Sequence, residues 1–153
     1  MKSSFKIPQL LLRCSLGLGF LTPVADRLGI LGAMGPENKN IEWGNWENFI
    51  SYTGTLMPFL DRPAVNVMGS IATLAEAIIG ILLIIGFKTK WAAISSCILT
   101  SIFALAMTLF LGIKAPLNYA VFTTCFSSLL LSMMPTYEWS VDNFSTRATA
   151  PAL

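Results

Sequence analysis

The sequence predicts an all-α integral membrane protein, a four-helix transmembrane bundle with one amphipathic interfacial helix in its first outer loop. The chain has 153 residues, of which 54% are hydrophobic and only 12% are charged. Soluble domains average about 25% charged residues. Apolar stretches of about 20 residues, long enough to cross a bilayer, recur along the chain. Short second and third connections require antiparallel neighbours. We therefore interpret residues 1–153 as one membrane domain.

The first predicted transmembrane helix covers residues 7–31 and follows a short basic N-terminus. A cleavable signal peptide is disfavoured, because Pro23 would lie three residues before a cut after Ala25. Arg13 is the charged residue within the apolar part of this helix. Its side chain could extend to the inner headgroups. Alternatively, it could pair with Glu76 of the second helix, and the residues alone leave both alternatives open.

The outer loop, residues 32–66, contains a second type of helical pattern. Trp46, Phe49, Ile50 and Thr53 recur at helical spacing. This pattern predicts a short amphipathic helix on the membrane surface, where tryptophan and tyrosine are enriched. Such a helix could be a simple anchor, or it could be a lid over a site between the outer helix ends.

The second predicted transmembrane helix, residues 67–87, carries one charged residue, Glu76, near its middle. An acid close to the bilayer midplane is costly and usually faces a partner or a wet cavity. Gly69, Thr73 and Gly80 share the face of Glu76, which suits close helix packing. Glu76 is therefore either a structural residue that locks the bundle or a functional acid.

The third and fourth predicted transmembrane helices cover residues 91–113 and 117–134. Pro116 opens the fourth, a position where proline is tolerated. Asn118 and Tyr119 at its start are candidate polar groups of an outer cavity. Lysine and arginine are slightly more frequent in the connections on the N-terminal side, so both termini are predicted to be cytoplasmic.

Several classes of site are disfavoured by what the sequence lacks. There is no histidine, the usual axial ligand of haem and the commonest protein ligand of zinc and copper. We therefore expect no haem and no metal. The three cysteines are far apart in sequence and form no CxxC motif, which disfavours a thiol relay. The net charge of +2 comes without a basic patch, so no nucleic-acid partner is expected.

Three segments together resemble the DoxX family of small bacterial membrane proteins: LLRCSLGLGFL, TLAEAIIGILLIIGFKTKWAA and ALAMTLFLGIKAPLNYAVFT. The resemblance covers roughly residues 10–131 and implies four transmembrane helices in the bacterial inner membrane. The positions that match the recurring pattern are Arg13, Glu76, Gly80, Gly86, Thr89, Pro116 and Tyr119. The chain departs from it at Asp26 and Arg27, where many members carry glycine and lysine.

The resemblance implies a subunit or accessory of a quinone-linked membrane oxidoreductase in sulfur or oxidative-stress metabolism. Glu76 would then relay a proton, with Arg13 as its counter-charge or as a group that orients the quinone. Trp46, Asn118 and Tyr119 are the candidate quinone-binding residues. The electrons would come from a partner redox subunit or from the substrate.

The alternative is a non-catalytic membrane module, either an assembly partner, a homo-oligomer or a carrier of a small molecule. The small-residue helix faces fit such a module equally well. Glu76 and Arg13 would then be a packing pair within the lipid bilayer. Transport is the weaker variant, because no internal repeat is visible and the last three predicted helices have no proline in their middle.

Overall fold

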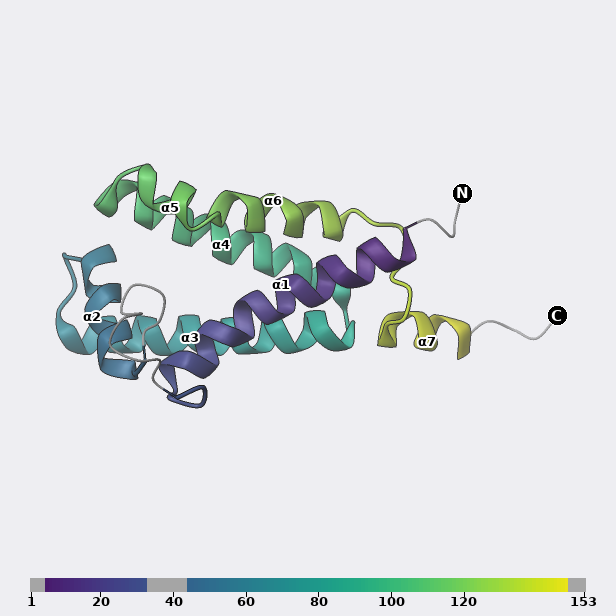
Figure 1. The fold of residues 1–153 in the computed structure, drawn as a ribbon, viewed down its shortest axis with the longest axis horizontal. Helices are drawn as coiled ribbons and strands as arrows, with labels where there is room; N and C mark the ends of the chain where they lie inside the picture. Colours follow the sequence, from purple (N-terminus) through teal and green to yellow (C-terminus); the bar gives the residue numbers. More distant parts are fainter. Residues whose placement is uncertain (1–4, 33–43, 149–153) are drawn as a thin grey trace.

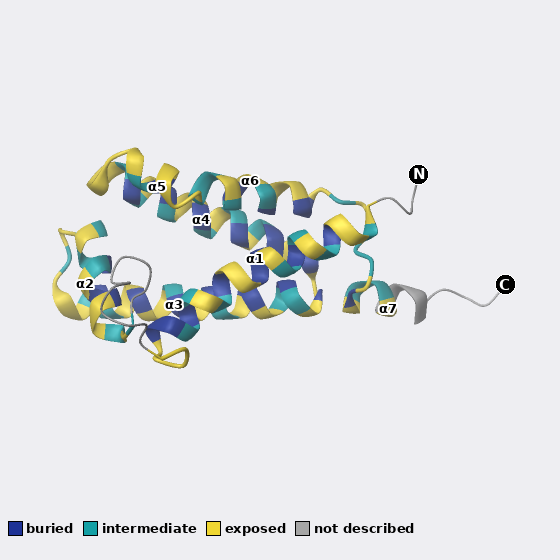
Figure 2. Ribbon diagram, viewed as in Figure 1, coloured by how far each residue is buried: buried dark blue, intermediate teal, exposed yellow. Residues whose placement is uncertain are grey.

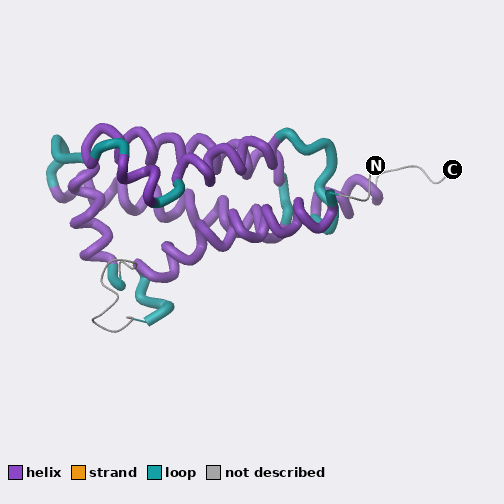
Figure 3. Tube along the Cα trace, turned by 45° about the horizontal axis from the view of Figure 1, so that its top comes forward, coloured by secondary structure: helices purple, strands orange, loops and turns teal. Residues whose placement is uncertain are grey.

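The computed structural model describes residues 5–32 and 44–148, and within these ranges the chain forms helices joined by turns and short connections, with no strand (Figure 1). The long helices lie side by side, and their connections gather at the two ends of the molecule (Figure 3). The helices are α1 (Lys6–Arg27), α2 (Trp46–Leu56), α3 (Arg62–Ile85), α4 (Thr89–Leu111), α5 (Lys114–Asn118), α6 (Val121–Ser132) and α7 (Val141–Ala148).

Three of these helices, α1, α3 and α4, are long and apolar enough to cross a membrane. The chain is therefore a multi-pass membrane protein. Helix α3 begins five residues before the predicted start because the Asp61 side chain accepts a hydrogen bond from the Ala64 N–H and Pro63 occupies the first turn. Helix α1 ends at Arg27 and not at residue 31, because the chain turns through Gly29 at a φ of 72°.

The predicted fourth helix, residues 117–134, is interrupted. Helix α5 ends at Asn118, Ala120 adopts a left-handed conformation with a φ of 52°, and α6 begins at Val121. Helix α6 alone has 12 residues, about 18 Å of helix against a hydrocarbon core of about 30 Å. Both short helices pack along α4 (Figure 1). The described residues thus contain three candidate spans. The prediction of a single continuous fourth helix over residues 117–134 is wrong.

Exposed and buried residues alternate along the long helices (Figure 2). Large apolar side chains predominate among the exposed residues, whereas many of the buried ones are small or polar. In α3, Ile71, Leu74 and Ile78 are each about half exposed or more, as expected of a face that lipid covers. Thr73 and Glu76 on the opposite face are buried. The predicted division of this helix into a packed face and a lipid-facing face is therefore confirmed.

Helices α1 and α3 approach each other most closely at two glycines. A Cβ atom added to Gly17 would lie 2.7 Å from Cγ1 of Ile84 and 3.0 Å from the Gly80 carbonyl oxygen. One added to Gly80 would lie 2.8 Å from Cγ of Leu21. This contact brings the two backbones together, as small residues do between membrane helices. It also sets the stagger of α1 against α3.

The close contact at Gly17 predicts that Gly17→Leu strongly destabilises the folded protein. The new side chain has no room between α1 and α3, and overpacking of this kind costs about 1–3 kcal/mol. We expect a lower Tm in detergent for Gly17→Leu. The matched control is Gly19→Leu in the same helix, because nothing lies within 4 Å of a Cβ at Gly19. Equal Tm values for the two variants would contradict the proposed packing.

Candidate functional site

The buried acid Glu76 forms an ion pair with Arg27 at the end of α1. Nη1 of Arg27 lies 2.6 Å from Oε2 of Glu76, and the two side chains are only 4% and 8% exposed. Glu76 lies within α3, about 21 Å along the axis from Arg62 and about 14 Å from Ile85. The ion pair is therefore held well inside the apolar part of the bundle. Two buried opposite charges remain ionised only if their geometry is good.

The guanidinium of Arg27 makes further contacts that fix its position. Its Nε donates to the Pro23 carbonyl oxygen at 3.1 Å, and its Nη1 donates to Oγ1 of Thr73 at 2.9 Å. Thr73 in turn donates to the Gly69 carbonyl oxygen at 2.8 Å. Thr73 and Glu76 present their oxygens to the same cation because they lie three residues apart on one face of α3.

Helix α2 covers this ion pair. The Phe49 ring lies over the Arg27 guanidinium, with 3.9 Å between the guanidinium carbon and the ring centroid, a cation–π contact of the strong, desolvated kind. Phe49 and Ile50 pack onto α3 at Gly69, where an added Cβ would lie 2.6 Å from Cδ1 of Ile50. The glycine thus admits α2 to the surface of α3.

The predicted amphipathic helix is confirmed, and it extends from Trp46 to Leu56. Asn45 caps its first turn through a hydrogen bond from the Asn48 N–H. The Trp46 indole donates to Oδ1 of Asn66 on α3 at 3.1 Å. Helix α2 is therefore attached to α3 at its first residue as well as through Phe49 and Ile50.

A pocket of about 250 Å³ opens between the end of α1 and the start of α2. It is lined by Arg27, Leu28, Gly29, Asn45 and Trp46. Arg27 therefore faces the pocket and contacts Glu76 at the same time. A carbonyl or anionic oxygen placed in this pocket could accept a hydrogen bond from the guanidinium. Glu76 is not among the lining residues.

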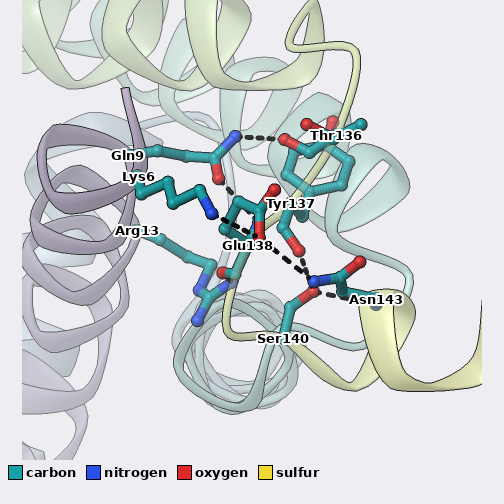
Figure 4. Close-up of polar contacts among 8 residues, drawn as sticks. All are labelled: Lys6, Gln9, Arg13, Thr136, Tyr137, Glu138, Ser140 and Asn143. Carbon is teal, nitrogen blue, oxygen red and sulfur yellow. Dashed lines mark hydrogen bonds and ion pairs between the residues drawn. The ribbon is translucent and has the colours of Figure 1, made fainter. Parts of the chain in front are cut away.

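Arg13 does not pair with Glu76, and that prediction is wrong. Arg13 is 1% exposed, and its guanidinium donates to the Trp139 carbonyl oxygen at 2.7 Å and to the Glu138 carbonyl oxygen at 3.4 Å. Figure 4 shows Arg13 beside Glu138. Arg13 and Arg27 lie 14 residues apart, about 21 Å along the helix axis. Because Arg13 is directed at backbone carbonyls of the C-terminal segment, it does not extend to lipid headgroups either.

Arg13 belongs to a second polar cluster, which we name the C-terminal junction and which holds the segment before α7 against α1 and α4 (Figure 4). Gln9 donates to the Thr136 carbonyl oxygen and accepts from the Glu138 N–H. The Asp142 carboxylate accepts from the backbone N–H groups of Lys88 and Thr89, each at 2.7 Å. Asp142 thereby caps the start of α4, which has no side-chain cap of its own.

The remaining predicted quinone-binding residues do not reach the ion pair. Asn118 and Tyr119 lie at the end of α5, and both are exposed. Tyr119 lies near Tyr52 of α2: burial raises the pKa of Tyr52 above its ordinary value, and the charge that Tyr119 would carry raises it further. Tyr52 therefore remains protonated at neutral pH. Of the three predicted residues, only Trp46 lines the pocket beside Arg27.

Sequence reasoning missed Arg27, although a signal was present. Arg13, Gly17, Phe20, Val24 and Arg27 recur at spacings of three and four, and all five are buried. The pattern places both arginines on one buried face of α1.

The described part of the chain has no cluster of three or more histidine, cysteine, aspartate or glutamate side chains that could hold a metal ion.

Two cysteines that are distant in sequence do come together. Sγ of Cys97 in α4 lies 3.5 Å from Sγ of Cys125 in α6. The two cysteines, far apart in sequence, therefore meet between α4 and α6.

Because the ion pair is buried, we expect the removal of one charge to lower the free energy of unfolding more than the removal of both. Removing one partner leaves an uncompensated buried charge, which costs about 3–5 kcal/mol. We expect Glu76→Leu to lower the free energy of unfolding by this order. The double variant Glu76→Leu with Arg27→Met removes both charges and should recover part of the loss. Reversible unfolding in mixed detergent measures both values.

The matched control for these variants is the exposed ion pair of Glu47 and Arg62. Their side chains are 71% and 56% exposed, and exposed pairs contribute about 0–1 kcal/mol. Glu47→Leu should therefore have little effect. A loss as large as that of Glu76→Leu, or a double variant less stable than Glu76→Leu alone, would rule out the asymmetry.

The C-terminal junction predicts local loosening in Arg13→Met. The Glu138 and Trp139 carbonyls lose the Arg13 donor, and the segment before α7 loses one of its attachments to α1, while those of Gln9 remain. We expect faster amide hydrogen exchange in residues 137–144, with α3 unchanged. The control is Lys6→Met, which removes only a partly exposed ion pair with Glu138, 3.8 Å between Nζ and Oε2. If amide hydrogen exchange in residues 137–144 is equally fast in Arg13→Met and in Lys6→Met, Arg13 does not hold the C-terminal junction together.

Comparison of the chain with protein-family models, curated proteins and solved structures finds no match in any of the three. No family is thereby assigned to the chain. The resemblance to the DoxX family rests on the sequence segments alone and enters below as part of a proposal.

Proposed function

We propose that the chain is a DoxX-like component of a quinone-linked membrane oxidoreductase, with its quinone site beneath α2. The observation that carries this proposal is that Arg27 belongs both to a pocket and to the ion pair with Glu76. Arg27 is one of the residues that line an open pocket of about 250 Å³, and its guanidinium holds the buried acid Glu76 at 2.6 Å. Ligand sites in proteins are typically apolar pockets with a few convergent polar groups.

The chemistry of quinone reduction fits these residues. Reduction of a quinone to a hydroquinone takes up two electrons and two protons. In this proposal Arg27 donates a hydrogen bond to a quinone oxygen, and the Trp46 indole forms an apolar wall of the pocket. Glu76 is ionised while it is paired with Arg27, so it takes up a proton when that contact opens and passes it to the reduced quinone. The second proton comes from water at the open side of the pocket, and both electrons come from the partner redox subunit. Arg13, Asn118 and Tyr119 have no part in it, because they do not line this pocket.

The proposed topology has four crossings, with α5 and α6 together forming the fourth. Residues 114–132 amount to about 28 Å of helix, close to the hydrocarbon thickness of about 30 Å. Both termini then lie on one side of the membrane. The distribution of lysine and arginine favours the cytoplasm of a bacterium for that side, with α2 at the outer face of the inner membrane. A partner redox subunit would meet the protein there.

A second function has a specific observation in its favour. The Arg27–Glu76 contact is closed, and both partners are buried, so their charges already compensate each other. A non-catalytic assembly module needs no more than this, because a buried ion pair can fix the register of packed helices. In that case Glu76 stabilises the bundle and no quinone binds.

Ligand binding separates the two functions. The purified protein in lipid nanodiscs is titrated with a short-chain ubiquinone while its Tm is followed. A ligand at one hundred times its Kd stabilises the folded state by about 2.7 kcal/mol, so we expect the Tm to rise by several degrees. Leu28→Trp fills the pocket and should abolish the rise.

Leu18→Trp is the matched control for Leu28→Trp. Both leucines belong to the α1 region and are 56% exposed, but Leu18 does not line the pocket. The Tm of Leu18→Trp should rise as that of the unaltered protein does. If quinone does not raise the Tm of the unaltered protein, or if both variants respond alike, the quinone site beneath α2 is refuted and the assembly function is favoured.

A further inference from the structure

Cys97 and Cys125 form a pair of thiols that the proposed quinone site does not use. They lie on α4 and α6, 28 residues apart in sequence, with 3.5 Å between their sulfur atoms. Both are free cysteines. A disulfide requires about 2.05 Å between the sulfurs. An approach of about 1.5 Å therefore separates the two thiols from a covalent bond, within the range of small side-chain adjustments between packed helices.

The surroundings of Cys125 provide a route for its proton. The Ser101 hydroxyl lies 3.0 Å from Sγ of Cys125. Ser101 donates its own hydrogen to the Cys97 carbonyl oxygen at 2.7 Å. The Cys125 thiol can therefore donate its hydrogen either to the Ser101 oxygen or to the Cys97 carbonyl oxygen, which lies 3.6 Å from its Sγ. Ser101 is exposed, so this hydroxyl connects the buried thiol with the outer surface of the helix pair.

The location of the thiols restricts what can react with them. Cys97 lies in α4, one of the three candidate membrane spans, and it is partly exposed, whereas Cys125 is buried. The neighbouring Ile98 and Phe126 are 56% and 62% exposed, as expected of a surface that lipid covers. Water-soluble thiols and peroxides are poorly soluble at such a surface. A reactant that reaches Cys97 from this side must be soluble in the bilayer.

We propose that Cys97 and Cys125 are a redox-active dithiol that a quinone dissolved in the bilayer oxidises to a disulfide. The two S–H bonds break and one S–S bond forms. Two electrons and two protons pass to the quinone, which becomes a hydroquinone. Cys97 reacts first because its sulfur is the more accessible, and Cys125 completes the disulfide. The choice of acceptor rests on the proposed quinone function, but the dithiol rests on the sulfur geometry alone.

The test uses the full chain in lipid nanodiscs under anaerobic conditions. The protein is reduced, freed of reductant and mixed with a short-chain ubiquinone. Hydroquinone is followed by absorbance, and the remaining thiols are counted with a maleimide reagent. The reduced chain has three thiols. We expect one thiol to remain after oxidation, Cys14, with one hydroquinone formed per chain and a mass loss of two hydrogens.

Single substitutions identify the reacting pair. Cys97→Ser and Cys125→Ser preserve side-chain size and should form no intramolecular disulfide and no hydroquinone. Cys14→Ser is the matched control and should react as the unaltered protein does. Hydroquinone formation by either of the first two variants at the rate of the unaltered protein would overturn the assignment. A covalent quinone adduct in place of the disulfide would also overturn it.

Two further measurements separate this inference from the quinone site beneath α2. Diamide oxidises thiols directly, so a disulfide that forms with diamide but not with quinone overturns the quinone as acceptor. Leu28→Trp closes the pocket beneath α2. A disulfide that still forms with quinone in this variant supports the dithiol even if quinone binding beneath α2 has failed.

Discussion

The structure depends on the ion pair between Arg27 and Glu76. Arg27 is at the end of α1 and Glu76 lies within α3, so the contact fixes how far one helix is displaced along the other. Helix α3 consequently continues about 21 Å beyond Glu76 toward Arg62, past the point where α1 ends. Helix α2 occupies the space left beside that extension. The covering of Arg27 by Phe49 follows from this displacement.

Much of this arrangement could be predicted from periodicity, because each buried face is a local property of one helix. The small polar face of α3 and the helix over Trp46–Leu56 are both present in the structure. The partner of Glu76 could not be predicted in the same way. A depth counted along α1 from its first residue selects Arg13 only if the start of α1 lies level with the end of α3, because the two helices are antiparallel. The glycine contact of Gly17 with Gly80 sets a different level.

Two other features escaped prediction because they arise between helices. The break at Ala120 has no glycine or proline to indicate it; the residue takes a left-handed φ of 52° where two helical segments meet beside α4. The contact of Cys97 with Cys125 depends on the register of α4 against α6. Nearby, Ser96 and Ser128 meet at 2.6 Å between the same helices, so polar side chains fix that register. No spacing rule within one segment reports such a contact.

The two proposals concern different helix pairs. The dithiol lies between α4 and α6, and the carboxylate of Glu76 lies between α1 and α3. Helices α3 and α4 are joined by the short connection through Gly86, where an added Cβ would lie 2.4 Å from Cβ of Ser140 and 2.7 Å from Nη1 of Arg13. Arg13 thus stabilises the place where the two helix pairs meet. Because Arg13 binds only backbone carbonyls among the described residues, it is a positioning residue. Arg27, at the other end of α1, lines the pocket.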